Sequence, residues 1–157
     1  MTRPTTRPPT QRPLVAIYRD EYHTLFAEKD SSLLCVIRSP VQFTTTTAIE
    51  ETFAGLSAAM DKVGRRDRVL LMDLRQVQGN NDPTFETTIL RHLALIEKGF
   101  LRIGTLLRTP AGVLQVKRMA GHDDIERIVS LDEREVFDFL RNGPKRTMPP
   151  RPPPPPE

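Results

Sequence analysis

The chain has 157 residues and a formal net charge of +3, with 38% hydrophobic residues, no tryptophan and one cysteine. This length fits one domain with appendages, and a single cysteine excludes both an intrachain disulfide and a zinc site built on cysteines. No stretch reaches the roughly 18 apolar residues of a membrane span, and the start has no apolar signal core, so we expect a cytoplasmic protein.

Both ends of the chain are rich in proline, since 12 of the 15 prolines lie in residues 1–13 and 143–157. Such segments bury too little apolar surface to order, so we expect disordered tails with polyproline II character. Residues 1–13 and 141–157 each carry +3, which leaves 16 basic and 19 acidic residues between them. Because nucleic-acid-binding domains usually carry their basic patch on the folded body, we expect no specific nucleic-acid partner.

The first expected elements form a β-hairpin. Tyr22–Glu28 alternates in part, Leu33–Arg38 is mostly apolar, and four turn residues separate them. Leu14–Tyr18 is a candidate for an additional short strand. Cys35 lies inside an apolar run, which is typical of a small buried hydrophobe.

A helix and a buried strand are expected next. Thr47–Glu50 fits a capping box and Gly64 a left-handed helix end, with an apolar stripe between them at spacings of three and four. The run Arg68–Leu74 is almost continuously apolar, as in a parallel strand that is buried on both faces.

The second half alternates helices with strands. Asp82 as N-cap and Pro83 in the first turn predict a helix that stops at Gly99. The remaining expected elements are a strand at Arg102–Leu107, a short helix from Thr109-Pro110 to Met119, a strand at Ile125–Val129, and a helix from a capping box at Ser130–Glu133 to Asn142.

The resulting order is β-β-α-β-α-β-α-β-α. Strands that alternate with helices through short connections favour a mainly parallel sheet with right-handed crossovers. We therefore expect an α/β domain over residues 14–142, to which the opening hairpin adds an antiparallel strand. Disordered tails at 1–13 and 143–157 would flank this domain.

Several stretches together resemble a known family. They are Val69–Arg75 (VLLMDLR), Asn81–Glu86 (NDPTFE), Phe100–Leu107 (FLRIGTLL) and the ending Val129–Leu140. Over roughly residues 20–140 the chain resembles the STAS domain, the fold of bacterial anti-sigma-factor antagonists, and more closely the uncharacterised SpoIIAA-like bacterial proteins. The resemblance implies a STAS-like fold and a non-catalytic regulatory module in bacterial signalling that binds a protein partner.

The phosphorylation site of the antagonists is only partly matched. In that family a serine begins the helix after the central strand, whereas here the segment Gly79–Thr84 contains no serine. Thr84 lies near the matching position, so the resemblance implies Thr84 as the candidate phospho-site. A phosphate would suit the free amides of a helix start, and the alternative is an ordinary first turn.

Polar residues gather after the central strand. They are Asp73, Arg75, Asn80, Asn81 and Asp82. Ligands of open α/β sheets bind at the carboxyl ends of strands, so we predict a partner or ligand surface here. The alternatives are a structural Asp–Arg pair in a solvated loop, and a small-ligand sensor for a lipid or a nucleotide.

The second tail carries a short motif. Arg146, Pro149 and Pro152 have the spacing of an SH3-type ligand. A polyproline-binding partner, with the domain as carrier, is therefore an alternative function. A solubilising spacer is the simpler interpretation.

Catalytic signals are few. His23, His92 and His122 lack metal-ligand spacing, and the sequence has no nucleophile elbow, phosphate loop or dinucleotide fingerprint. We therefore expect no metal, no cofactor and no enzyme activity. An enzyme would need a concave pocket near Asp73, Arg75 or His92.

Overall fold

The computed structural model describes residues 12–77, 82–119 and 123–144. These residues form an α/β domain of six strands and four helices. In chain order they are β1 (Leu14–Arg19), β2 (His23–Glu28), β3 (Leu33–Arg38), α1 (Thr46–Val63), β4 (Val69–Asp73), α2 (Pro83–Glu97), β5 (Arg102–Leu106), α3 (Pro110–Met119), β6 (Glu126–Ser130) and α4 (Glu133–Asn142).

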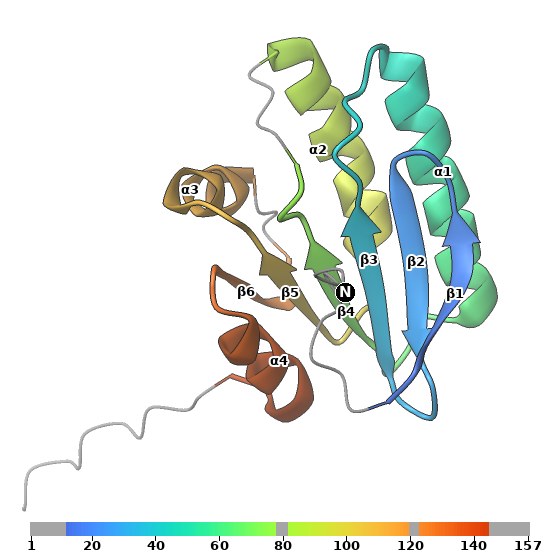
Figure 1. Cartoon of the computed structure of the whole chain (residues 1–157), viewed down its shortest axis with the longest axis vertical. Coiled ribbons are helices and arrows are strands. Elements are labelled where there is room, and N and C mark those ends of the chain that lie inside the picture. The colour runs from blue at the N-terminus through green and yellow to red at the C-terminus, as the bar shows by residue number, and fades with distance from the viewer. Residues whose placement is uncertain (1–11, 78–81, 120–122, 145–157) are drawn as a thin grey trace, which may run out of the picture.

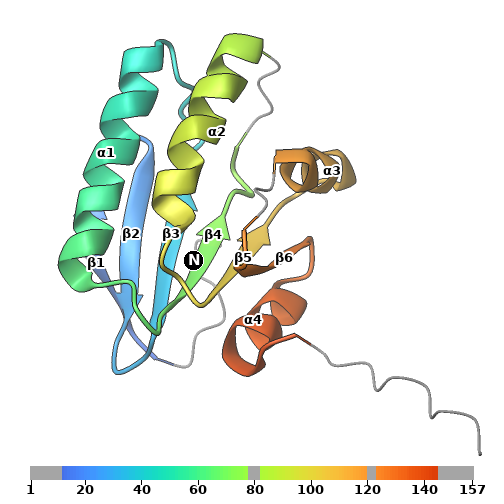
Figure 2. The same cartoon turned by 180° about the vertical axis from the view of Figure 1, so that it is seen from behind.

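One mixed sheet organises the described part of the chain. Its strand order is β1-β2-β3-β4-β5-β6. The pairs β1–β2 and β2–β3 are antiparallel, and the pairs from β3 to β6 are parallel. Helices α1 and α2 lie side by side on one face, α4 packs on the other face against β4, β5 and β6, and α3 contacts β6 (Figures 1 and 2).

The predicted fold class, a mainly parallel α/β sheet, is confirmed. The predicted element order was short by one strand, because three strands precede α1. The additional strand is β1, at the edge of the sheet, where Val15 and Ile17 stay 51% and 38% exposed. Exposed apolar residues on both faces give no clean alternation, so the local pattern marked this segment only as a candidate.

Two helix starts differ from the predicted capping boxes by two residues. The N-cap of α1 is Thr45, whose hydroxyl accepts from the amide of Ala48 at 3.0 Å. The N-cap of α4 is Asp132, because Ser130 still pairs with Leu106 as the last residue of β6. Asp82 caps α2 with Pro83 in its first turn, as predicted.

The alternation of side chains along β4 separates two hydrophobic cores. Leu70 and Met72 face α1 and α2, whereas Val69 and Leu71 face α4. Asp73 is the next residue in the α4-facing series. The face to which the last residue of a strand points therefore decides whether its side chain lies near α1 and α2 or near α4.

Within residues 12–77, 82–119 and 123–144, none of the helices combines the length and the apolar character that crossing a membrane requires.

Candidate functional site

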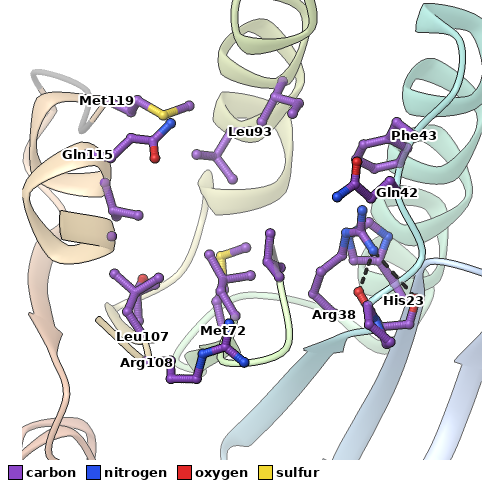
Figure 3. A pocket seen from close by; sticks show the side chains of 18 of the residues that line it. His23, Arg38, Gln42, Phe43, Met72, Leu93, Leu107, Arg108, Gln115 and Met119 are labelled. Atoms are coloured by element: carbon purple, nitrogen blue, oxygen red, sulfur yellow. Dashed lines mark hydrogen bonds between the residues drawn. The ribbon is translucent and has the colours of Figure 1, made fainter. Parts of the chain in front are cut away.

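A cavity of about 430 Å³ lies at the carboxyl ends of β3, β4 and β5, on the sheet face covered by α1 and α2 (Figure 3). Its walls come from α2, α3 and the segment that joins β3 to α1. Most of the lining is apolar, and the main contributors on the two helices are Phe85, Ile89, Leu93, Ala111, Val116 and Met119.

The sequence positions explain this lining. Phe85, Ile89 and Leu93 recur every fourth residue of α2, so they share one face of that helix. Met72 lies on the α1–α2 side of β4 and forms part of the floor. An apolar space of this size falls in the range of small-molecule sites in proteins.

Arg38 is the buried cation of the cavity. It ends β3, is only 6% exposed, and is the direct cross-strand neighbour of His23. Its Nη1 donates to the carbonyl oxygens of Ser39 at 2.6 Å and Val41 at 2.7 Å. The guanidinium carbon also lies 4.4 Å from the ring centre of Phe43. These contacts hold the side chain in place, but none of them is with a carboxylate.

Within the described ranges, Arg38 forms no ion pair with a carboxylate. Its Nε and Nη2 have no acceptor there either. Burial lowers the pKa of Arg38, because a charge removed from water is costly unless it is paired. Among the described lining residues the one carboxylate is Glu97, and Arg127 pairs with it at 2.7 Å. The cavity therefore carries an excess of positive charge.

His23 lies beside Arg38 and is 3% exposed. Its Nδ1 lies 2.8 Å from the hydroxyl oxygen of Thr52, and its ring packs edge-on against Phe53. Burial and the neighbouring Arg38 lower the pKa of His23 to about 4. The imidazole is therefore neutral near pH 7.

Asp20 supports this side of the cavity from behind. Its Oδ1 accepts from the amides of Tyr22 and His23, and its Oδ2 accepts from the hydroxyls of Tyr18 and Thr52, both at 2.5 Å. Burial alone would raise the pKa of Asp20, but these hydrogen bonds outweigh it and lower the pKa. The carboxylate is thus ionised and fully occupied.

The predicted residues Asp73 and Arg75 lie on the opposite face of the sheet. Asp73 is 2% exposed and accepts from Nε of Arg75 at 2.9 Å and from its Nη2 at 2.7 Å. Glu133 of α4 lies 3.5 Å from the same guanidinium. This is the structural pair that the sequence left as an alternative, and neither residue lines the cavity.

The other predicted site residues lie elsewhere. Asp82 and Thr84 are exposed at the start of α2, where the carboxylate of Asp82 accepts from the amide of Thr84. Asn80 and Asn81 fall outside the described residues. The same holds for His122 and for the tail motif Arg146, Pro149 and Pro152.

The remaining candidates for reactive chemistry are enclosed. Cys35 is fully buried, and burial raises the pKa of its thiol, as expected for a small hydrophobe. His92 stacks on Phe53, and its Nε2 is buried with no hydrogen-bond partner among residues 12–77, 82–119 and 123–144. Residues 12–77, 82–119 and 123–144 contain no cluster of three or more potential metal ligands.

Arg38 was not among the residues predicted from the sequence, and His23 was considered there only as a metal ligand. A usable signal was present, because Arg38 ends an apolar strand in the same way as the polar residues after β4. What the sequence lacked was the strand pairing that places Arg38 opposite His23.

The fold belongs to the SpoIIAA-like class of α/β domains. A solved structure with this fold is that of an uncharacterised protein from the DUF3478 family of Shewanella loihica PV-4. It matches with a TM-score of 0.52 and 16% sequence identity, over 78% of this chain and 98% of that chain. The expected SpoIIAA-like architecture is therefore confirmed. No protein-family model and no curated protein sequence matches this chain.

Proposed function

We propose that this domain is a non-catalytic sensor that binds a small amphipathic anion. The hydrocarbon part would lie between α2 and α3, and the anionic oxygen would pair with Arg38. The observation that carries the proposal is a guanidinium that is 6% exposed, lines an apolar cavity and has no carboxylate partner in the described part of the chain.

An anion would supply the counterion that Arg38 lacks among the described residues. A buried charge is tolerated when it is paired, and hydrogen bonds to a charged group contribute about 1.5–3 kcal/mol each. Nη1 of Arg38 is used by two backbone carbonyls, so Nε and Nη2 remain for an anion. Arg108 is exposed at the rim and adds a second positive charge.

The apolar lining determines the rest of the ligand. Side chains from α2 and α3 offer few hydrogen-bonding groups, so a hydrocarbon or aromatic body fits them better than a sugar or a base. This argument favours the lipid form of the small-ligand hypothesis over the nucleotide form. It also moves the site from Asp73 to the opposite face of the sheet.

The test compares decanoate, decanol and decylammonium by calorimetry on the full chain. We expect decanoate to bind at least about tenfold more tightly than decanol, and decylammonium to bind most weakly. Arg38→Met should remove the advantage of decanoate. Arg134→Met, which removes an exposed charge from α4, should not. Equal binding of decanoate and decanol to the wild type would refute the proposal.

A protein contact through α2 is the second candidate function. Leu90 and Leu95 of this helix are 37% and 43% exposed, and Leu114 of α3 is 66% exposed. A contiguous patch built from such side chains would mark a contact surface. A binding protein isolated with the wild-type chain should be lost with Leu90→Glu/Leu95→Glu and retained with Arg38→Met.

A further inference from the structure

The hydrogen bonds behind His23 determine which ring nitrogen carries the proton. Thr52 has one hydroxyl proton, and its oxygen lies 2.5 Å from Oδ2 of Asp20, which is an acceptor. The proton of Thr52 is therefore donated to Asp20. Because Nδ1 of His23 lies 2.8 Å from the same hydroxyl oxygen, that nitrogen must donate its own proton to Thr52.

This assignment leaves Nε2 of His23 as a hydrogen-bond acceptor. A neutral imidazole with its proton on Nδ1 has a lone pair on Nε2. None of the described residues donates to this atom. The titratable or charged groups around the ring are Asp20, Arg38 and, beyond Phe53, His92. Of these, Asp20 raises the pKa of His23, but burial and the charge of Arg38 outweigh it, so the ring stays neutral near pH 7.

A donor and an acceptor thus lie side by side at the polar end of the cavity. His23 and Arg38 are directly paired residues of neighbouring strands, so their side chains emerge on the same face, and both line the cavity (Figure 3). Arg38 offers N–H groups to an anionic oxygen. Nε2 of His23 requires an O–H or N–H from the same ligand.

A simple carboxylate satisfies only half of this arrangement. Its oxygens accept from Arg38, but an ionised carboxylate has no proton for Nε2, and an unsatisfied buried acceptor weakens binding about tenfold or more. We propose, resting on the proposed function, that the preferred ligand carries an anionic oxygen with an O–H group beside it. Two chemical classes fit: an apolar hydroxy acid and a monoprotonated phosphate monoester.

The test compares decanoate, α-hydroxydecanoate and decyl phosphate at about pH 6, where phosphate monoesters are partly monoprotonated. We expect α-hydroxydecanoate to bind about tenfold more tightly than decanoate, although the two have the same charge. Tighter binding of decyl phosphate than of α-hydroxydecanoate would identify the phosphate class. The reverse order would identify the hydroxy acids.

Thr52→Val tests the tautomer of His23 with little change in the shape of the site. This change removes the hydroxyl that fixes the proton on Nδ1, so Nε2 becomes able to carry the proton and donate to a carboxylate. We expect the preference for α-hydroxydecanoate to disappear. Thr47→Val makes the same side-chain change at an exposed position of α1 and should preserve it.

The NMR chemical shifts of the two ring nitrogens of His23 give a second measurement. It is made on the wild-type chain, so it does not depend on the folding of a variant. We expect the Nδ1–H tautomer in the wild type. An Nε2–H tautomer, or equal affinities of the wild type for decanoate and α-hydroxydecanoate, would overturn this inference. If these anions bind equally and Arg38→Met weakens both, the proposed function stands and only the head-group assignment fails.

Discussion

Two polar clusters lie at the carboxyl edge of the same sheet, and they differ in how their charges are paired. On the α4 face, Asp73 and Arg75 form a two-point ion pair that Glu133 extends. On the α1–α2 face, Arg38 and His23 are both buried but have no carboxylate partner among the described residues. The first cluster pairs its charges within the chain, whereas the second leaves the charge of Arg38 unpaired among the described residues, and the proposed ligand site rests on that difference.

The contrast shows that a position at a strand end specifies the edge of the sheet but not its face. Both clusters obey the rule that polar groups gather at the carboxyl ends of parallel strands. The rule identifies the edge but not the face, because successive residues point to opposite sides of the sheet. The pairing of charges, and not the position at a strand end, is therefore what distinguishes the two clusters.

The largest expected effect follows from breaking the complete cluster. Asp73→Ala should lower the free energy of unfolding by about 2–4 kcal/mol, because it leaves Arg75 without its main partner. The partial exposure of Arg75 keeps the loss below that of a fully buried pair. Urea denaturation measures this change.

Arg38→Met is the matched variant on the other face. Replacing an unpaired buried charge by an apolar side chain should leave the free energy of unfolding unchanged or raise it by about 1 kcal/mol. A loss as large as that of Asp73→Ala would mean that Arg38 also has a structural partner, and the contrast between the clusters would fail.

A change of pH should alter the free energy of unfolding somewhat less than Asp73→Ala does. The pKa of His23 is about 4 in the folded chain, against 6.5 for an ordinary histidine, so the unfolded chain binds more protons between these values. The contribution of His23 to stability should therefore fall by about 2–3 kcal/mol as the pH decreases from about 6.5 to about 4, and Glu97, whose pKa is raised by burial, offsets part of this loss.

His23→Gln should flatten this part of the stability curve, measured by urea denaturation across the pH range. Asp20 has a lowered pKa and adds its own loss only at more acidic pH, below its ordinary value of 3.8. Parallel curves for the wild type and the variant between about pH 4 and 6.5 would contradict the neutral state of His23.

The smallest expected change in the free energy of unfolding comes from Gly104→Ala. This variant also tests whether packing on the α4 face affects binding on the α1–α2 face. Gly104 of β5 lies under α4, and an added Cβ would lie 2.6 Å from Cγ1 of Val136 and 3.2 Å from Cγ of Leu140. Gly104→Ala should therefore cost about 1–2 kcal/mol by overpacking, as measured by urea denaturation. The affinity for decanoate should not change, and a loss of affinity would show that the faces are coupled.

Most of the fold could be predicted from local patterns. The stripe of α1, the continuous apolar run of β4 and the cap at Asp82 each specify an element within about ten residues of sequence. The start of α1 was misplaced because four consecutive threonines, Thr44–Thr47, offer several candidate caps. The edge strand β1 was uncertain because its pairing with β2, rather than its own pattern, makes it a strand.

The site was less predictable because it depends on contacts between distant segments. Thr52 and His23 are 29 positions apart, and Arg38 meets His23 only through the pairing of β2 with β3. The cavity lining combines α2 with α3, neither of which carries a chemical motif. The sequence therefore predicted a surface at the edge of the sheet where the cavity also lies, but its residues Asp73 and Arg75 point to the opposite face from the cavity lining.

The weak attachment of α3 has a consequence for the kinetics of binding. None of its ten residues is fully buried, yet Val116 and Met119 form part of the cavity wall. Segments with few buried contacts open at low free energy, so amide hydrogens of α3 should exchange with solvent well before those of β4. Ligand residence time would then be set by this one helix, and the sheet would keep Arg38 and His23 in position throughout each exchange.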